Sequence, residues 1–503
     1  MSPKSQIVVL SDLHIADDSP TAWYQSSIHN PYLASICSWV VTNAAAVREM
    51  VILGDMVDFW THPADTQPPS FAQILAKQQS IFGPKGFFGQ VLDALGGAVT
   101  YLPGNHDMGV TAADVAKVVS AGGHRMRFAD DVYSLMGAND RRIALAHGHA
   151  YTMFNAPDPK SPWAPLPVGH FVTRMVASKW ARELPPGKTV ATLPGQGSPT
   201  GLDVAAIVGG AVKRGDFGIS NLLLDSVASQ TGTPSNQTFV LPSGQKVALD
   251  RDVFPAYNNL FSNWVTDNGG GEVGLLIAGK SALADAQGSY MGWFAQRQAF
   301  KSVAQVIILG HTHTPISGIP NSLIQYANSG FECPSTADMP PQAVTFAVID
   351  TNNFTTQIMQ SAKGGSHIVP FQAGTAPIVE PPFQDYSAYV IIENDGVDNM
   401  TLVGSPRAEQ GYWVVPPSQT IAARTRKMIW LQDFPGAQGT VGSVTYQSRS
   451  RGQQTFSFAC PVGFWTANAC TGGAAFRSRV GDQGWQSNAV DRWGHPLYVE
   501  FTA

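Results

Sequence analysis

Five short apolar runs in this chain each end in a cluster of polar residues, and this recurrence restricts the fold more than any other feature of the sequence. The runs occupy residues 7–10, 50–53, 99–102, 143–146 and 306–309. Runs of four or five apolar residues bounded by turn signals are typical of buried strands. Because stretches such as 32–47 have the length and alanine content of helices, the sequence predicts a layered α/β fold.

The polar clusters directly follow these runs, at the position where open α/β sheets bind their ligands. The clusters supply carboxylates, one carboxamide and imidazoles: Asp12, His14, Asp55, Asn105, His106, Asp107, His147, His311 and His313. These groups are suited to Mn, Fe or Zn. One such cluster alone is more often a polar turn, but five in one chain, each after an apolar run, predict a metal centre.

Two of the clusters have the spacing of paired ligands. Asp12 and His14 are two residues apart, as are His311 and His313, and in an extended chain such residues share a face. The carboxylate of Asp55 is placed to bridge two ions. We therefore expect two divalent metal ions, whose identity the donor set leaves open among Mn, Fe and Zn.

Composition and motifs exclude several other classes of function. The chain has 31 Lys and Arg against 36 Asp and Glu, a net charge of −5, so we expect no nucleic-acid binding through charge. No apolar run approaches the ~18 residues of a transmembrane segment. The sequence contains neither a Gly-x-Ser-x-Gly elbow nor a phosphate-binding P-loop. The absence of a standard secretory signal favours a cytoplasmic location, with signal-independent export as the alternative.

The character of the sequence changes twice along the chain. About 160 residues separate His147 from His311, and their proline-rich start predicts that 151–300 is an insertion that caps the polar clusters. Gly, Pro and Ala dominate 363–385, which predicts a linker. Residues 386–503 contain alternating stretches, five of the 12 Trp and almost no helical periodicity, so they predict a separate all-β sandwich.

In their order along the chain, the polar motifs resemble those of the calcineurin-like metallophosphoesterase family. The motifs are Asp12-Leu13-His14, Gly54-Asp55-Met56-Val57-Asp58, Gly104-Asn105-His106-Asp107, His147-Gly148-His149, Gly310-His311-Thr312-His313 and Asn328-Ser329-Gly330. Apart from the insertion, the resemblance covers residues 5–350. It implies that 1–362 form a four-layer α/β/β/α sandwich with a binuclear, metal-dependent phosphoesterase site.

The resemblance also assigns roles to individual residues. One ion would be held by Asp12, His14, Asp55 and His313, and the other by Asp55, Asn105, His147 and His311. A metal-bridged hydroxide would attack phosphorus. The catalytic His106, oriented by Asp107, would protonate the leaving alkoxide. Asp58, His149 and Asn328 are expected to support the ligands or to face the substrate.

Within this superfamily, the segment 54–60 and the His147-Gly148 pair resemble the branch of UDP-diacylglucosamine pyrophosphohydrolases. The chain departs from that branch at His149, where those enzymes commonly carry an acidic residue, and in its larger insertion. In the insertion, His170, Arg174 and Arg182 are candidates to meet a phosphate, although a solvated helix face is the favoured interpretation for each.

The C-terminal region resembles the aegerolysin-like β-sandwich proteins, which interact with membrane lipids. The matching features are Pro416-Pro417, Ile421-Ala422-Ala423, Trp430, the segment 439–446, Phe456-Ser457-Phe458 and Pro461-Val462-Gly463. Most aromatic residues of this region are expected in its core, whereas Trp465, Trp485 and Trp493 are candidates for lipid contact. Cys460 and Cys470 are a plausible disulfide, with buried free thiols the commoner alternative.

Three hypotheses of function follow. The first is a phosphoesterase, a phosphodiesterase above all, that cleaves a phosphodiester or pyrophosphate bond of a lipid or nucleotide substrate and carries a lipid- or partner-binding module. The second is a phosphomonoesterase or nucleotide phosphodiesterase whose C-terminal domain is structural. The third is a lipid-binding or toxin-like protein with the phosphoesterase fold as a carrier, which the complete ligand set argues against.

Overall fold

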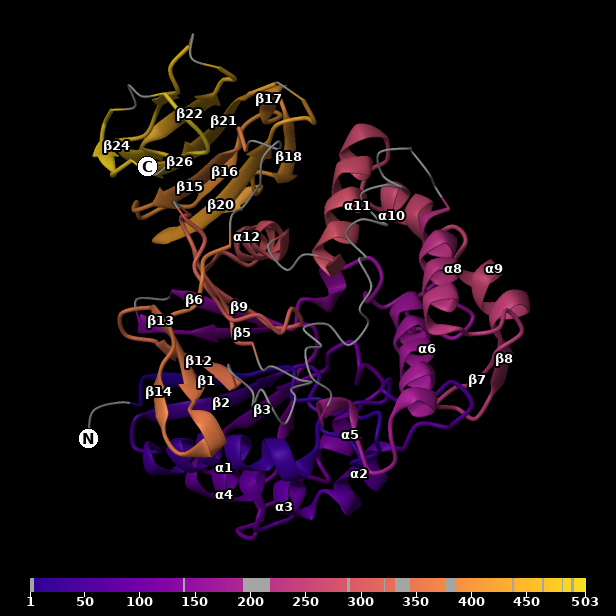
Figure 1. Cartoon of the computed structure of the whole chain (residues 1–503). Helices are drawn as coiled ribbons and strands as arrows, with labels where there is room; N and C mark the ends of the chain where they lie inside the picture. The colour runs from indigo at the N-terminus through magenta and orange to yellow at the C-terminus, as the bar shows by residue number, and fades with distance from the viewer. Residues whose placement is uncertain are drawn as a thin grey trace.

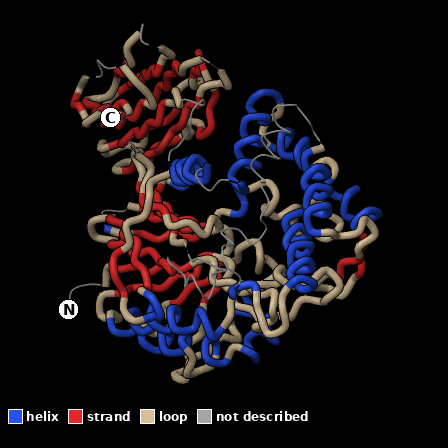
Figure 2. Tube along the Cα trace, in the orientation of Figure 1, coloured by secondary structure: helices blue, strands red, loops and turns tan. Residues whose placement is uncertain are grey.

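The computed structural model describes residues 4–138, 141–192, 218–286, 290–320, 322–330, 344–376, 385–436, 438–463, 466–481, 483–489 and 493–503. Two sheets with flanking helices form the first part of the chain, and a helical cap projects from it. From residue 385 onward, the regular elements of the described residues are all strands (Figures 1 and 2). The expectation of an α/β region followed by a β-rich region is confirmed. None of the described helices combines the length and the apolarity that crossing a bilayer requires.

Two sheets make up the α/β part. The first has the order β14-β13-β12-β1-β2-β3-β4, and the second has the order β10-β11-β9-β6-β5. The strands of the first sheet are β1 (Gln6–Leu10), β2 (Val47–Leu53), β3 (Val99–Leu102), β4 (Arg127–Phe128), β12 (Val344–Asp350), β13 (Thr355–Ser361) and β14 (Ile368–Pro370). Those of the second are β5 (Val132–Met136), β6 (Arg142–Ala146), β9 (Ala304–Leu309), β10 (Ile316–Ser317) and β11 (Gln325–Asn328).

The five predicted apolar strands are all present, as β1, β2, β3, β6 and β9. Strands β1, β2 and β3 are parallel, and so are β6 and β9, so within each sheet the carboxyl ends of these strands lie at one edge. This parallel pairing is what gathers the polar clusters, because each cluster begins where its strand ends.

Alternation along β1 explains why its sequence is apolar throughout. Ile7 and Val9 pack in the core shared by the two sheets, whereas Val8 and Leu10 pack in the core that includes helices α1 (Ser26–Thr42) and α4 (Phe87–Ala94). Strands that are covered on both faces read as continuous apolar runs. The α/β part also contains three shorter helices: α2 (Phe71–Lys77), α3 (Gln79–Phe82) and α5 (Ala112–Val115).

Helix α1 begins and ends earlier than the predicted range 32–47. Its last residue is Thr42, and Asn43 closes it by donating from Nδ2 to the carbonyl of Trp39 at 2.8 Å. The following alanines, which favour a helix by composition, form the turn into β2 instead. A side-chain cap and the start of a buried strand at Val47 therefore override the helical propensity of this segment.

The cap has an apolar core of its own. Its helices are α6 (Val168–Glu183), α8 (Ile219–Thr231), α9 (Phe254–Tyr257), α10 (Leu260–Asp267) and α11 (Gly271–Ala286), and its hairpin pairs β7 (Thr238–Val240) with β8 (Lys246–Ala248). Phe171, Leu224 and Phe239 are central members of that core. Residues 291–300, which the sequence placed in the insertion, belong to α12 (Met291–Ser302), whose side chains pack against the second sheet.

The C-terminal region is a pair of sheets with an apolar core between them. One sheet is ordered β18-β20-β15-β26-β24-β25, and the other β19-β16-β21-β22-β23 with β17 paired to β21. The strands of the first are β15 (Ala388–Asn394), β18 (Tyr412–Val415), β20 (Thr425–Gln432), β24 (Ala475–Val480), β25 (Gln486–Ser487) and β26 (Leu497–Thr502). Those of the second are β16 (Met400–Leu402), β17 (Arg407–Gln410), β19 (Thr420–Ile421), β21 (Thr440–Ser448), β22 (Gly452–Cys460) and β23 (Ala469–Thr471). Cys460 and Cys470 are buried free thiols.

Helix α12 connects this β-rich region to the α/β part. One set of α12 side chains packs on the second sheet of the α/β part, and Trp293 and Phe300 also contact the outer face of the sheet that contains β15 and β20. The ring centroids of Trp293 and Trp430 are 5.4 Å apart, and those of Phe300 and Tyr389 are 5.5 Å apart. The two regions thus share an apolar interface. The predicted linker contains strand β14, and its residues 377–384 lie outside the described part of the chain.

Candidate metal centre

The loops that follow β1, β2 and β9 have an unusual backbone. Asp12, His14, Asp55, His311 and His313 all have positive φ, between 50° and 72°. The expectation that Asp12 and His14 share a face of an extended chain is therefore wrong, and so is its counterpart at His311 and His313. Left-handed conformations of side-chain-bearing residues cost about 1–3 kcal/mol each and concentrate at functional sites.

Hydrogen bonds between the loops hold this backbone in place. The N–H of Asp12 donates to the carbonyl of Gly54 at 3.2 Å, and the N–H of His14 donates to the carbonyl of Asp55 at 2.8 Å. The N–H of His311 donates to Oδ1 of Asp12 at 2.9 Å. Loops from both sheets are thus joined at the level of the ligands.

Two glycines of the motifs are required by close packing. A Cβ on Gly54, whose φ is +79°, would lie 2.3 Å from the ring of His147, and a Cβ on Gly104 would lie 2.2 Å from Oδ1 of Asp55. Only glycine lets the backbone approach these two side chains so closely.

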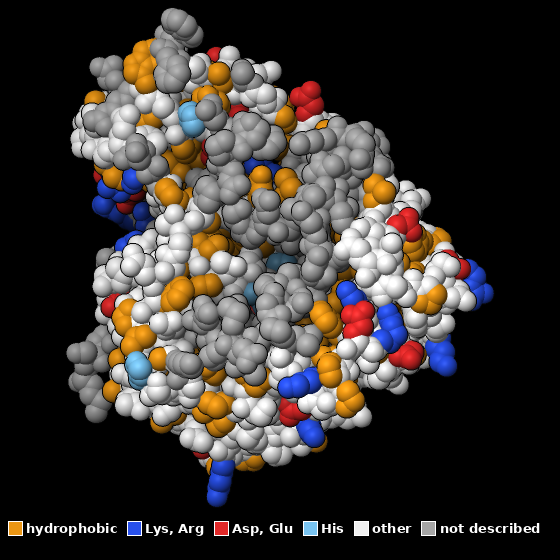
Figure 3. Space-filling view, viewed as in Figure 1, with side chains coloured by type: hydrophobic (Ala, Val, Ile, Leu, Met, Phe, Trp, Pro, Cys, Tyr) orange, Lys and Arg blue, Asp and Glu red, His pale blue; other side chains and the backbone are white. Residues whose placement is uncertain are grey.

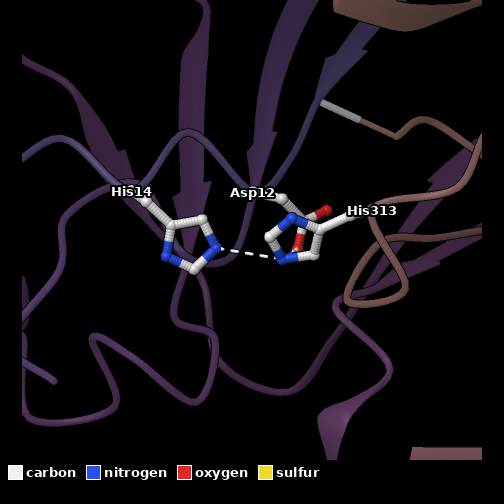
Figure 4. A group of neighbouring side chains, drawn as sticks. All are labelled: Asp12, His14 and His313. Carbon is white, nitrogen blue, oxygen red and sulfur yellow. Dashed lines mark hydrogen bonds and ion pairs between the residues drawn. The ribbon is translucent and has the colours of Figure 1, made fainter. Parts of the chain in front are cut away.

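Asp12, His14 and His313 form one group of donor atoms (Figure 4). The Nε2 atoms of His14 and His313 face each other at 3.1 Å, and Nε2 of His313 is 3.7 Å from Oδ1 of Asp12. Asp12 and His14 are fully buried, whereas the His313 side chain is about one quarter exposed. Two imidazole nitrogens and a carboxylate that converge in this way fit a divalent cation.

Asp55, His147 and His311 form a second group. Nε2 of His147 lies 3.2 Å from Oδ2 of Asp55. Oδ1 of Asn105 lies 3.1 Å from Nε2 of His147 and 2.9 Å from Nδ1 of His311, which places the predicted carboxamide in the same group. Oδ2 of Asp55 is also 3.7 Å from Nε2 of His14, so one carboxylate oxygen faces both groups.

The remaining nitrogens of two histidines are fixed by partners outside the centre. Nδ1 of His147 donates to the carbonyl of Leu53 at 2.8 Å, and Nδ1 of His14 pairs with Oδ2 of Asp58 at 3.0 Å. Because a carbonyl or carboxylate can only accept, these contacts direct the lone pair of each Nε2 toward the centre. Such outer partners orient metal-binding imidazoles. The residues present thus fit two divalent ions.

Burial and neighbouring charges shift the pKa values of this centre. Burial alone would raise the pKa of Asp55 and Asp58, but adjacent histidines, chiefly His147 for Asp55 and His106 for Asp58, outweigh it and lower both. Burial opposes the charge of His147, yet Asp55 raises its pKa to about 9. Burial and the neighbouring His147 lower the pKa of His149 to about 3. Asp55 and Asp58 are therefore ionised at neutral pH.

Asp107 does not orient His106, which corrects the predicted role. Its carboxylate accepts hydrogen bonds from backbone N–H groups, among them Gly104 at 2.6 Å and Met56 at 2.7 Å, so it joins the loops after β2 and β3. Nδ1 of His106 lies 3.1 Å from Oδ1 of Asp58 instead, and the His106 ring stacks on Trp60 with centroids 4.4 Å apart. Asp58 thus contacts both His14 and His106.

The other predicted site residues take different places. Nδ2 of Asn328, in β11, donates to the carbonyl of Gly310 at 2.6 Å and so supports the His311 loop. The ring centroids of His149 and His147 are 5.2 Å apart. Arg174 is neither a phosphate contact nor part of a solvated face, because it is fully buried and bonded to backbone carbonyls. His170 is fully buried as well, and Arg182 is exposed.

Three side chains at the centre escaped the sequence reasoning. Oγ1 of Thr152 lies 3.0 Å from Nε2 of His311, and Oγ of Ser11 contacts both Asp12 and, at 2.6 Å, Oγ of Ser329. Trp23 packs edge-on against His14 with centroids 4.8 Å apart. Thr152 and Trp23 lie outside every recognised motif, so no local signal marks them.

Replacing Asp58 by asparagine should weaken metal binding. The variant keeps the shape of the side chain but removes the charge that orients His14 and His106, and loss of such an outer partner lowers metal affinity about 10–100-fold. Isothermal titration of metal-stripped protein with Mn²⁺ measures the change, with Asp130→Asn, an exposed site, as the control. Unchanged affinity in Asp58→Asn would contradict the orienting role.

Comparisons with known proteins do not establish a family for this chain. No family model matches the chain, and no curated protein matches it. Among solved structures, it is similar to a dimetal phosphatase from Danio rerio, with 12% identity, a TM-score of 0.29, and coverage of 74% of this chain and 100% of that one. It is also similar to the lipid-binding protein Nakanori (12% identity, TM-score 0.16, 23% of this chain and 69% of that one) and to IP-1A from Alcaligenes faecalis (12%, 0.17, 24% and 93%). TM-scores this low do not establish a shared fold, so the functional conclusion depends on the side chains of the site.

Proposed function

We propose that the protein is a binuclear metal-dependent phosphoesterase with the four-layer α/β/β/α architecture of the calcineurin-like family. The observation that carries the proposal is the pair of donor groups that face the same oxygen of Asp55, at the carboxyl ends of parallel strands from two sheets. Two ions that share a carboxylate clamp a phosphoryl group for in-line displacement. The apolar cores on either side of β1 and the packing of α12 support the layered architecture.

The chemistry that such ions supply when bound is Lewis-acid activation of water and neutralisation of phosphoryl charge. The residues of the chain do the rest. Asn105 and the histidines hold the positions of the two sites, and Asp58 and Trp60 fix the ring of His106. Because Nδ1 of His106 faces Asp58, Nε2 is the ring nitrogen that is left to donate a proton to the leaving oxygen.

Hydrolysis of bis(p-nitrophenyl) phosphate and p-nitrophenyl phosphate by metal-stripped protein, with and without added Mn²⁺, tests the proposal. We expect Mn²⁺-dependent cleavage, with the diester favoured over the monoester. Two bound ions without any cleavage would contradict the activity but not the metal centre. Absence of metal binding would contradict both and would favour the lipid-binding alternative.

Replacing His106 by alanine should lower kcat about 10²–10⁴-fold, the usual contribution of a general acid. Metal content should be retained, because the two donor groups each keep three or more other ligands. Turnover of bis(p-nitrophenyl) phosphate and metal analysis of the same sample make the comparison. Loss of metal in the alanine variant would show that His106 is a ligand and not a general acid. Its position beside His14 and Asp55 is compatible with that role.

We further propose that the C-terminal sandwich binds lipid headgroups through exposed tryptophans. Trp485 is 36% exposed and Trp493 is 42% exposed, and the guanidinium of Arg477 lies 4.8 Å from the ring centroid of Trp485. Amphipathic rings suit the headgroup region of a membrane, although the charge of Arg477 is paired with Glu500. Trp465, the third candidate, lies outside the described residues.

Sedimentation of the full chain with liposomes that contain phosphatidylserine tests this module. Removal of both rings, by Trp485→Ala with Trp493→Ala, should reduce the bound fraction at least about fivefold, because each ring contributes about 1 kcal/mol or more of apolar burial. Met136→Ala, an exposed hydrophobic residue of the α/β part, serves as the control. Equal binding of the two variants would leave the sandwich with a structural role only. The full chain is required, since truncation before residue 385 would expose the α12 interface.

A further inference from the structure

A cavity of about 790 Å³ opens beside the metal centre, between the α/β part and the cap. His106 lines this cavity. A nitrogen of the same ring also lies close to donor atoms of His14 and Asp55, so the cavity adjoins the metal centre at His106. None of the seven predicted ligands lines it. A substrate with its phosphorus at the metal centre would therefore extend past His106 into this cavity. On the face that Figure 3 shows, histidine atoms are visible near the middle.

Apolar side chains make up just over half of the wall, and most of the others are uncharged polar groups such as Gln67 and Gln73. Phe59 and Trp60 come from the loop after β2, Trp163 and Leu166 come from the start of the cap, and Leu241 comes from its hairpin. Five prolines complete these surfaces. Clefts of this size bind groups of the size of a drug molecule.

The charge in the cavity is unfavourable for an anion. Asp17 is the only carboxylate in the wall, and no lysine or arginine lines it among the residues that the structure describes. Burial lowers the pKa of His62, the second imidazole of the wall, so its ring is neutral near pH 7. Arg174 does not line the cavity, and its guanidinium is bonded to the carbonyls of His62, Pro63 and Ala64.

We infer that this cavity is the leaving-group subsite of the proposed phosphoesterase and that it accepts an uncharged, largely apolar alcohol. The inference rests on the proposed function, because His106 must face the leaving oxygen. It selects phosphodiesters over pyrophosphates. Cleavage of a pyrophosphate leaves an anionic phosphate on the side of His106, where Asp17 repels it and no lysine or arginine in the described wall compensates for the lost hydration.

Hydrolysis of four methyl phosphodiesters by the full chain with Mn²⁺ tests the inference. Their leaving alcohols are 2-phenylethanol, 2-(4-carboxyphenyl)ethanol, octanol and methanol. We expect kcat/KM for the phenylethyl ester to exceed that of the carboxylate-bearing ester about tenfold, and that of dimethyl phosphate by more. A comparison of kcat/KM for the octyl and phenylethyl esters shows whether the cavity prefers a lipid-like chain or an aromatic ring. A carboxylate-bearing ester that reacts as fast as the phenylethyl ester would overturn the inference.

A variant at the rim tests the charge argument directly. Gln245 is exposed on the β7–β8 turn and lines the cavity, so Gln245→Lys adds a cation without disturbing the core. At low salt we expect the rate of the carboxylate-bearing ester, relative to the phenylethyl ester, to rise about threefold, in line with an exposed ion pair. Gln230→Lys, on the exposed face of α8 and outside the cavity, should leave the ratio unchanged. An equal effect of both variants would overturn the inference.

Binding of the free alcohols separates this inference from the proposed function. Trp60 and Trp163 line the cavity, so 2-phenylethanol should change the tryptophan fluorescence of the protein more strongly than 2-(4-carboxyphenyl)ethanol does, with or without metal. If no ester is hydrolysed but this preference is found, the proposed function is wrong and the apolar subsite stands. If the two alcohols bind equally, the subsite is wrong whatever the enzymatic activity.

Discussion

We expect Asp55→Asn to lower kcat/KM on bis(p-nitrophenyl) phosphate about 10³-fold or more and to remove most bound metal. The same oxygen of Asp55 lies 3.2 Å from Nε2 of His147 and 3.7 Å from Nε2 of His14, so a single substitution affects both donor groups. An amide retains the size of the side chain but has no charge to offset two divalent ions, and several kcal/mol of transition-state stabilisation are lost with them.

Metal analysis and steady-state kinetics on one preparation measure this result. Asp130→Asn, an exposed carboxylate, should match the wild-type protein in both. An Asp55→Asn protein that binds two ions and turns over normally would show that the carboxylate does not bridge. Loss of activity with both ions retained would instead limit Asp55 to a catalytic role.

Arg174→Met lowers the free energy of unfolding by roughly 3–5 kcal/mol, the cost of leaving buried polar partners unpaired. Arg174 is fully buried in α6, and its guanidinium bonds to the carbonyls of His62, Pro63, Ala64, Thr66 and Val240. These carbonyls belong to the loop after β2 and to the cap hairpin. Methionine fills the space but cannot donate, so the loop and the cap lose their common anchor.

Urea denaturation measures the change, and Arg182→Met provides the matched control. Arg182 lies on the same helix but is exposed, and among the described residues it bonds one carbonyl, that of Thr231, so its loss should cost about 1 kcal/mol or less. Equal destabilisation by the two substitutions would mean that the network of Arg174 contributes nothing beyond a surface arginine.

The sequence was sufficient to predict the strands and the gathering of the polar clusters. Strands β1, β2 and β9 are covered on both faces, so each appears as an apolar run, and parallel neighbours necessarily end at one edge. Given those two facts, the meeting of Asp12 and Asp55 follows without any knowledge of loop conformation. Predictions of this kind depend on local pattern and general topology alone. The approach of His311, which follows β9 in the other sheet, also depends on how the two sheets pack together.

The details of the centre could not be predicted in the same way. The positive φ values of Asp12 and His14 arise from hydrogen bonds to the loop after β2, which no alternation rule contains. The family resemblance implied that Asp107 orients His106, yet the carboxylate of Asp107 accepts hydrogen bonds from backbone N–H groups, and Asp58 contacts His106 instead. Thr152 reaches His311 only through the fold of the cap entrance.

The boundary of the cap was misplaced for a similar reason. Residues 291–302 look like any amphipathic helix in the sequence, and only their packing shows that Trp293 and Phe300 serve the second sheet and the C-terminal sandwich at once. Alternation along the strands likewise placed most aromatic residues of the sandwich in its own core, where Phe456, Phe458 and Phe501 do lie. Tyr389, Trp430 and Tyr498 instead face α12.

Helix α12 also determines how the molecule responds to heat. Its apolar side chains belong to a core that includes residues from β6, β9, β15 and β20, so neither the α/β part nor the sandwich can melt without exposing the other. Elements that share buried contacts in this way form one cooperative unit in calorimetry, rather than two domains with separate transitions. The helix also leads directly into β9, and His311 follows that strand. The thermal stability of the sandwich and that of the metal centre are therefore expected to be coupled.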